Sequence, residues 1–289
     1  MDPSPPYAHT LGVQLVDALL ANGKRIFTSA DAAAAASALG QSAGSLRWLL
    51  HELTESGWIL RSRRGLYLID ETQRGGPAPH PFAIATAVVE PSAISHWSAL
   101  AHHGLTEQVP RIVTASTIKD VVTPAMRAGK AGAARAGQRQ GAANSPQSSV
   151  WQIGSLQIRY VRVQPRHFWG LEEVWIDEFS RVAITDRERT LLDGFLAPAV
   201  FGSLQEVVGA LEEHLDEVDV EKLVAYVLRY GQGATIKRVG YVLEQLGADS
   251  EAIRPLLDAP VKGYRPLDPQ GPARGSHVAR WQIRENVTA

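Results

Sequence analysis

The chain has 289 residues, of which 45% are hydrophobic, contains no cysteine and carries a formal net charge of -1. The length favours two domains, and the lack of cysteine excludes thiol catalysis and cysteine-ligated zinc and fits a reducing cytoplasm. The sequence predicts neither a signal peptide nor a membrane span, and a near-neutral chain must confine any nucleic-acid site to a local patch.

Three helical patterns open the chain. The first, over 11–21, carries leucines on one stripe and ends at Asn22-Gly23. The second is the alanine-rich run that Asp31 opens and Gly40 ends. Ser42 is a candidate N-cap for the third helix, 43–56, whose leucines also share one face.

A short basic hairpin follows, with the sequence GWILRSRRGLYLI over residues 57–69. Two apolar runs flank a turn that contains Arg61, Arg63 and Arg64. The order of helix, helix, turn, helix and two-stranded ribbon is that of a winged helix-turn-helix. The sequence therefore predicts such a DNA-binding domain over residues 1–75.

The second helix of a helix-turn-helix enters the major groove with its N-terminal end. Backbone N–H groups at that end favour phosphate, and an arginine there binds a guanine edge or a phosphate. The wing arginines would bind the neighbouring backbone or minor groove. The candidate DNA contacts are therefore Ser42, Ser45, Arg47, His51, Arg61, Arg63 and Arg64.

Two alternatives to DNA contact remain open from the motif alone. The arginines also fit a solvated hairpin tip, and small winged domains also bind proteins. Trp48 fits the outer surface of its helix and the core equally well.

Beyond a Gly/Pro-rich linker at 73–81, helices and strands alternate without regular βαβ units, which favours a mixed α+β domain over 82–289. Helical patterns lie within 82–110, at 204–215 and at 235–247. Strand-like stretches lie at 112–122, 150–163, 181–185 and 279–286.

The stretch 124–149 is small, polar and basic, which is typical of a flexible arm. Between 111 and 139, six basic residues against Asp120 alone give a local charge of +5. This surface is a candidate secondary nucleic-acid contact, carried by Lys119, Arg127, Lys130, Arg135 and Arg139.

The sequence contains no phosphate-binding loop, nucleophile elbow or H-E-x-x-H motif, so it predicts no enzyme, cofactor or metal site. One remote alternative is a nucleotidyltransferase, because Gly202-Ser203 precedes an acidic pair, Glu217 and Asp219, of the type that holds Mg²⁺. Those carboxylates need a strand, and here they lie between helical patterns. Asp219 is better interpreted as a helix N-cap.

Five segments in order carry related motifs: the RRG-x-Y wing (63–67), ISHWSALAHHGL (94–105), RVAITDRERTLLDGF (181–195), TIKRVGYVLEQLG (235–247) and YRPLDP…WQIREN (264–286). Their order and spacing resemble the AbiEi family, the antitoxin half of the AbiE abortive-infection toxin–antitoxin systems. Thr185 and Arg189 replace the family's usual residues, and the 124–149 arm departs from its pattern.

The resemblance implies an N-terminal winged helix-turn-helix that represses its own operon at inverted repeats in double-stranded DNA. It also implies a C-terminal domain that opposes a nucleotidyltransferase-like toxin encoded next door. The expected protein is a cytoplasmic DNA-binding antitoxin and transcriptional autorepressor that does not bind membranes. Direct contact with the toxin is left open, so a protein-interaction module that sequesters the toxin is the alternative.

Overall fold

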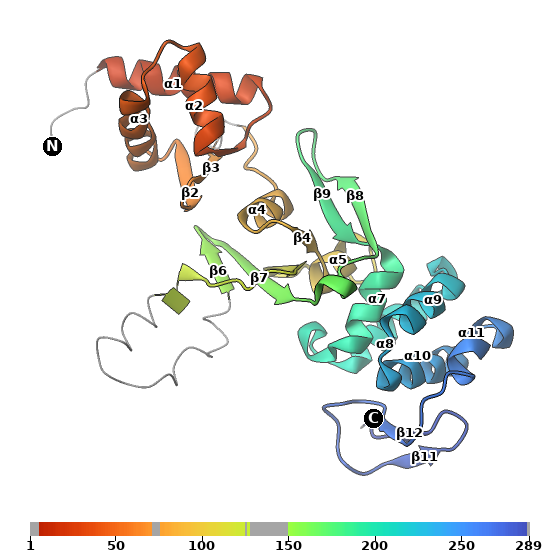
Figure 1. The fold of residues 1–289 in the computed structure, drawn as a ribbon. Coiled ribbons are helices and arrows are strands. Elements are labelled where there is room, and N and C mark those ends of the chain that lie inside the picture. The colour runs from red at the N-terminus through yellow and green to blue at the C-terminus, as the bar shows by residue number, and fades with distance from the viewer. Residues whose placement is uncertain (1–5, 71–75, 125, 128–149, 288–289) are drawn as a thin grey trace, which may run out of the picture.

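The computed structural model describes residues 6–70, 76–124, 126–127 and 150–287 (Figure 1). Helices and mixed sheets confirm the expected α+β class. An N-terminal unit, residues 6–70, has the winged helix-turn-helix order and is called the winged unit below. Its elements are α1 (Pro6–Ala21), β1 (Ile26–Thr28), α2 (Ser29–Ala38), α3 (Ala43–Glu55), β2 (Ile59–Arg63) and β3 (Leu66–Ile69).

Strand β1 was missed in the sequence, because three residues are too few to display an alternating pattern. It pairs antiparallel with β3, which makes the wing a three-stranded sheet in the order β1-β3-β2. The predicted start of α2 at Asp31 is also wrong, since the helix begins at Ser29 and Thr28 is its N-cap. Thr28 Oγ1 accepts from the Asp31 N–H at 3.1 Å, and Asp31 Oδ2 accepts from the Thr28 N–H at 2.8 Å. Asp31 therefore completes a capping box.

The small sheet of the winged unit is covered on both faces. Tyr67 and Ile69 pack with the buried side chains of the three helices, and Phe27 stacks on Tyr67 with 5.5 Å between ring centroids. Leu66 and Leu68 point the other way and pack with buried residues of a second, larger sheet. Because successive side chains of β3 point to opposite faces of its sheet, this short strand packs against both the helices of the winged unit and the larger sheet.

The larger sheet has six strands in the order β6-β7-β5-β4-β9-β8. The pairs β5–β7 and β4–β9 are parallel and the others antiparallel. Helix α4 (Pro81–Val88) contributes to the buried cluster that holds Leu66 and Leu68, and Tyr160 donates to the Ala85 carbonyl at 2.6 Å. The other elements of this layer are β4 (Ser92–Ile94), α5 (His96–His102), β5 (Ile112–Thr117), β6 (Val150–Ile153), β7 (Leu156–Arg162), β8 (Leu171–Trp175) and β9 (Arg181–Thr185).

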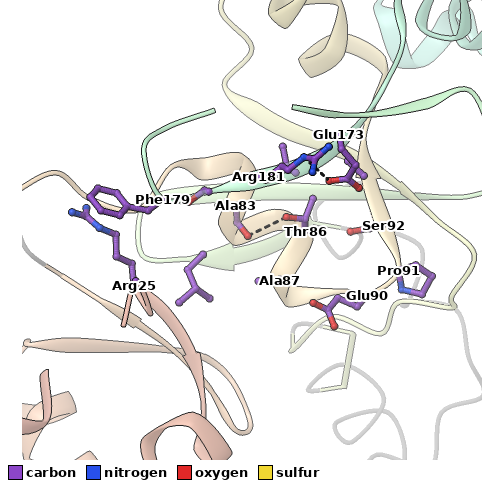
Figure 2. A pocket seen from close by; sticks show the side chains of 15 residues that line it. Arg25, Ala83, Thr86, Ala87, Glu90, Pro91, Ser92, Glu173, Phe179 and Arg181 are labelled. Atoms are coloured by element: carbon purple, nitrogen blue, oxygen red, sulfur yellow. Dashed lines mark hydrogen bonds and ion pairs between the residues drawn. The ribbon is translucent and has the colours of Figure 1, made fainter. Parts of the chain in front are cut away.

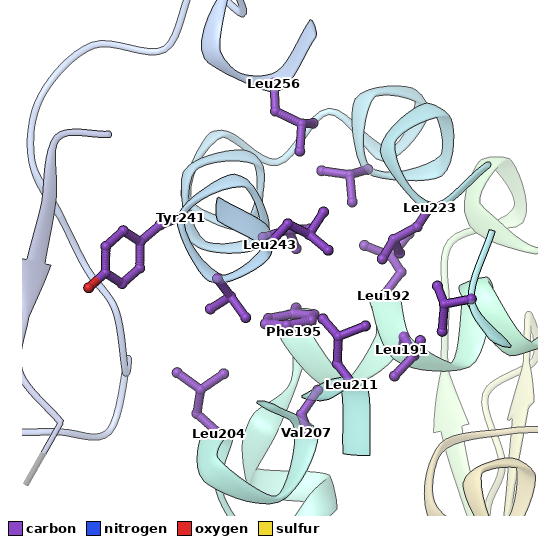
Figure 3. Packing of buried hydrophobic residues seen from close by; sticks show 14 of the residues in the cluster. Leu191, Leu192, Phe195, Leu204, Val207, Leu211, Leu223, Tyr241, Leu243 and Leu256 are labelled. Carbon is purple, nitrogen blue, oxygen red and sulfur yellow. The ribbon is translucent and has the colours of Figure 1, made fainter. Parts of the chain in front are cut away.

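A helical layer follows, with the largest apolar cluster at its centre (Figure 3). Trp281 packs so closely against α10 that a Cβ at Gly240 would overlap its ring, so this helix position requires glycine. The helices are α7 (Arg187–Leu196), α8 (Leu204–Glu213), α9 (Val220–Tyr230), α10 (Gly233–Gln245) and α11 (Ser250–Leu257). A small sheet in the order β10-β12-β11 closes the chain, with β10 (Arg265–Pro266), β11 (Ser276–Val278) and β12 (Ile283–Glu285).

Arg189 is one of several charged side chains that are buried in this layer. Arg189 is 2% exposed, and its guanidinium donates to Asp193 at 2.9 Å and to the carbonyls of His167 and Trp169 at 2.8 and 2.7 Å. The Trp169 ring also lies 4.5 Å from the guanidinium carbon. Arg189 therefore fastens the segment before β8 to α7.

Candidate nucleic-acid interface

Helix α3 separates its side chains into a buried and an exposed face. Four leucines at 46, 49, 50 and 53 are buried, as their spacing predicted. Arg47 and His51 are exposed on the opposite face. Trp48 is 42% exposed, which places it on the outer face and not in the core. The outer face of α3 therefore offers a guanidinium, an imidazole and an indole to a partner.

The N-terminus of α3 has the cap that the sequence predicted. Ser42 Oγ accepts from the Ser45 N–H at 3.3 Å, and Ser45 Oγ donates to the Ser42 carbonyl at 2.8 Å. A Cβ at the exposed Gly44 would meet only Ser42 Oγ, at 3.8 Å, so the backbone of this turn is open to a ligand. Such a helix start favours an anion through its N–H groups and dipole.

The tip of the wing is a tight turn anchored to α2. Gly65 has a φ of +77°, which favours glycine, and its carbonyl accepts from the Ser29 N–H at 3.0 Å. A bulge lies between Arg61 and Arg63, where buried Ser62 donates to the Leu66 carbonyl at 3.2 Å. The tip is therefore fixed by its own sheet and by the start of a helix.

The structure places the three wing arginines differently, although all three are exposed. Arg61 pairs with Tyr67 and Arg63 with Leu66, and paired residues share a face of the sheet. Arg61 therefore lies on the side of the helices and Arg63 on the side of the six-stranded sheet. Burial raises the pKa of the Tyr160 hydroxyl, and the charge of Arg63 lowers it in part. Arg63 therefore lies close to the sheet as well as to solvent.

Two hairpins of the larger sheet reach the winged unit (Figure 1). At the turn between β6 and β7, a Cβ on Gly154 would lie 3.8 Å from Leu60 of β2. Between β8 and β9, Phe179 stacks beneath Arg25, with the guanidinium carbon 3.9 Å from the ring centroid. Arg25 also donates to the Pro77 carbonyl at 3.3 Å. Both contacts orient the winged unit on the sheet.

A cavity of about 360 Å³ opens at the second of these contacts (Figure 2). Side chains from the winged unit, α4 and the β8–β9 hairpin line it, including Arg25, Glu90 and Arg181. Ser92 also lines it, and its buried hydroxyl has no hydrogen-bond partner in the described part of the chain. The cavity belongs to this junction, and none of the candidate DNA-contact residues lines it.

The predicted secondary basic surface is described only in part. Lys119 and Arg127 are exposed, whereas Lys130, Arg135 and Arg139 lie outside the described residues. Asp120 forms an exposed ion pair with Arg162 at 2.9 Å.

The acidic pair considered for phosphoryl transfer does not lie on a strand. Ser203 and Asp219 cap α8 and α9, and Glu217 pairs with Arg187 at 2.8 Å. Within the described ranges, no group of three acidic or histidine side chains is arranged to hold a metal ion. None of the helices in the described parts of the chain is long and apolar enough to cross a membrane.

Comparison with known proteins gives one family and one fold. Residues 14–69, from α1 to the end of β3, match the model of a family described as transcriptional regulators, AbiEi antitoxins. The RV2827C protein from Mycobacterium tuberculosis has a similar fold, with a TM-score of 0.62 and 14% identity over 98% of this chain and 92% of that one. No curated protein matches the sequence. The winged unit is thus similar to the AbiEi antitoxin family of transcriptional regulators, and the resemblance predicted from the sequence is confirmed for these residues.

Proposed function

We propose that this protein is a DNA-binding antitoxin that represses its own operon at inverted repeats. The observation that carries the proposal is the exposed polar face of α3 beside a wing with three exposed arginines, in a unit that matches a family of antitoxin regulators. We further propose that residues 1–75 form the DNA-binding domain and residues 82–289 the domain that opposes the toxin.

In this proposal the two parts of the surface have different roles. Helix α3 lies in the major groove, where Arg47 and His51 reach base edges and the turn at Ser42 and Ser45 holds a phosphate. The wing arginines bind the adjacent backbone, so they position the protein without reading sequence. Arg61 and Arg64 are the stronger phosphate ligands, because Arg63 lies on the side of the six-stranded sheet.

A gel-shift titration with the protein's own upstream region tests the DNA proposal. We expect binding that weakens as salt rises, and a salt slope reduced by about 2 in the double variant Arg61→Ala, Arg64→Ala. Arg274→Ala, which removes an exposed arginine near the C-terminus, is the matched control and should bind as the wild type does. No binding at low salt, or an unchanged salt slope in the double variant, would contradict the proposal.

Toxin opposition is tested separately, by co-expression with the neighbouring gene product. Co-purification in a fixed ratio would favour direct sequestration by residues 82–289. Rescue of growth without a stable complex would favour control through transcription or an indirect route. Neither result depends on the wing arginines.

A further inference from the structure

Helix α8 has an outer face that no other described element covers completely. Its inner residues, such as Val207 and Leu211, are fully buried (Figure 3), but Val208 is half-buried and Gly209 exposed. Two hollows, of about 420 and 370 Å³, lie on either side of the helix. Both are lined by Gln205 and Gly209, so they form one surface divided by α8. We call this surface the α8 groove.

Apolar side chains form part of the first hollow and most of the second. The first lies between α8 and α5, with Trp97 and Leu105 among its walls. The second lies between α8 and α10, with Tyr241 and Leu246 among its walls and Val287, which is 37% exposed, at its edge. A ligand that fills both hollows must straddle a helix and present apolar groups on both sides of it.

The charges around the α8 groove all have one sign. Its charged lining residues are Glu107, Glu206, Glu212 and Glu213. Over the described residues, none of these four carboxylates forms an ion pair, whereas Glu217 just beyond α8 pairs with Arg187. Four carboxylates without an ion pair in the described part of the chain, around a partly apolar floor, favour a cationic, partly apolar partner.

We propose that the α8 groove binds a basic amphipathic helix of a partner protein. Such a helix places apolar side chains at i, i+3, i+4 and i+7, which suits hollows on two sides of a ridge, and flanks them with lysine or arginine. Nucleic acids and anionic membranes carry the same charge sign as the groove and would be repelled. A small molecule would fill one hollow and leave the other open. The proposal does not depend on DNA binding, because no DNA-contact candidate lies in the groove.

Substitution of Gly209 by a large side chain is expected to block the α8 groove. It lines both hollows, and a Cβ added there meets no atom within 4 Å. Gly209→Trp therefore places a ring in the groove from the protein's own side, starting from a position where the Cβ itself meets no neighbour. Gly209→Ala adds one methyl group, leaves both hollows open and is the matched control.

The test uses the full chain and a fluorescein-labelled helical peptide of leucine and lysine, about 18 residues or five turns long. Fluorescence anisotropy at low salt should show binding to the wild type and to Gly209→Ala, and binding about tenfold weaker to Gly209→Trp. The double variant Glu212→Lys, Glu213→Lys should lose affinity similarly, while Glu178→Lys, an exposed site outside the groove, should not. The same peptide with glutamate in place of lysine should not bind.

Equal affinity for the wild type and Gly209→Trp, or equal binding of both peptides, would overturn the proposal. So would a self-associated wild type that Gly209→Trp makes monomeric in sedimentation, since the occupant would then be a second copy of the chain. Circular dichroism establishes that the variants are folded. If Gly209→Trp does not fold, the charge-reversal pair and its Glu178→Lys control decide the outcome.

Discussion

At the scale of single residues, Arg189 combines deep burial with a full set of partners. The ion pair with Asp193 and the two carbonyl contacts replace the water that the guanidinium loses. Asp193 Oδ2 is buried with no partner of its own among the described residues, so its carboxylate depends on Arg189 for charge compensation. A buried pair of this kind is costly to break from one side.

We expect Arg189→Ala to lower the free energy of unfolding by about 3–5 kcal/mol, because it leaves the Asp193 carboxylate buried and unpaired. Urea unfolding measures the loss. The control is Arg181→Ala, whose ion pair with Glu173 spans 4.0 Å between side chains about half exposed. That change should cost less than about 1 kcal/mol. Equal losses for the two variants would contradict the role given to Arg189.

Arg47 and Arg64 are expected to contribute to DNA binding in different ways. Arg47→Ala should cost about 1–3 kcal/mol on the operator and relax specificity at one base position, because Arg47 lies on the outer face of α3. Arg64→Ala should weaken binding to all sequences equally and lower the salt slope by about 1. Competition gel-shifts with single-base operator variants separate the two effects. Loss of specificity in Arg64→Ala would contradict the division between helix and wing.

Much of this surface follows from the sequence, and some of it does not. The Ser42 cap and the leucine face of α3 follow from spacing, which local hydrogen bonding and helical periodicity impose. The exposure of Trp48 could not be predicted from spacing, since Trp48 lies at the edge of the apolar stripe of α3. The different positions of Arg61 and Arg63 depend on a bulge at Ser62, which no residue pattern signals.

At the scale of elements, α2 is a run of alanines that starts at a strong cap. The side-chain hydrogen bond from Thr28, followed by its backbone N–H, lowers the pKa of Asp31 from 3.8 to about 2. A lowered carboxyl pKa stabilises the fold at pH values above 3.8. That contribution declines as the pH falls from 3.8 towards 2.

We therefore expect Asp31→Asn to be less stable than the wild type at neutral pH, with a difference that shrinks as the pH falls below about 4. Urea unfolding at a series of pH values measures the difference. In a Thr28→Val background, which removes the hydroxyl donor, the pH dependence of the same substitution should be smaller. A difference that is constant with pH would show that the carboxylate charge does not contribute.

Elements with clear periodicity could be predicted, whereas short or charged ones could not. The strand at 181–185 and the helix α3 were correct because their patterns are regular. Strand β8 was missed because LEEVW carries two exposed glutamates on an edge strand. The parallel pairs β5–β7 and β4–β9 join segments far apart in the chain, and pairing of that kind leaves no local signal.

At the scale of the whole molecule, the winged unit is one of several packed layers. Leu66 and Leu68 of β3 belong to the apolar cluster of the six-stranded sheet, although the sequence analysis assigns them to the predicted DNA-binding domain. The sequence predicted the α+β class and the order of the two parts correctly. It did not predict their contact. The run LYLI places apolar side chains on both faces of β3, but it does not indicate which residues cover each face.

This contact yields a prediction for a fragment of residues 1–76. In the full chain Leu68→Thr should cost about 1.5–3 kcal/mol, because Leu68 is 4% exposed. In the fragment the same side chain faces water, so the substitution should be nearly neutral. Urea unfolding of all four proteins measures the two differences, with Ile69→Val, on the helix side of β3, as a control that should cost the same in both contexts. An equal cost of Leu68→Thr in both would contradict the packing described.

The wing lies between its own helices and two hairpins of the larger sheet. An isolated β-ribbon samples many orientations, and binding must select one of them at an entropic cost. Here the orientation is set during folding by Gly65, by the leucines beneath the sheet and by the contact at Gly154. In the proposed complex, the wing arginines would therefore be preorganised before they contact DNA. The entropic cost of orienting the wing would be met when the chain folds and not when it binds.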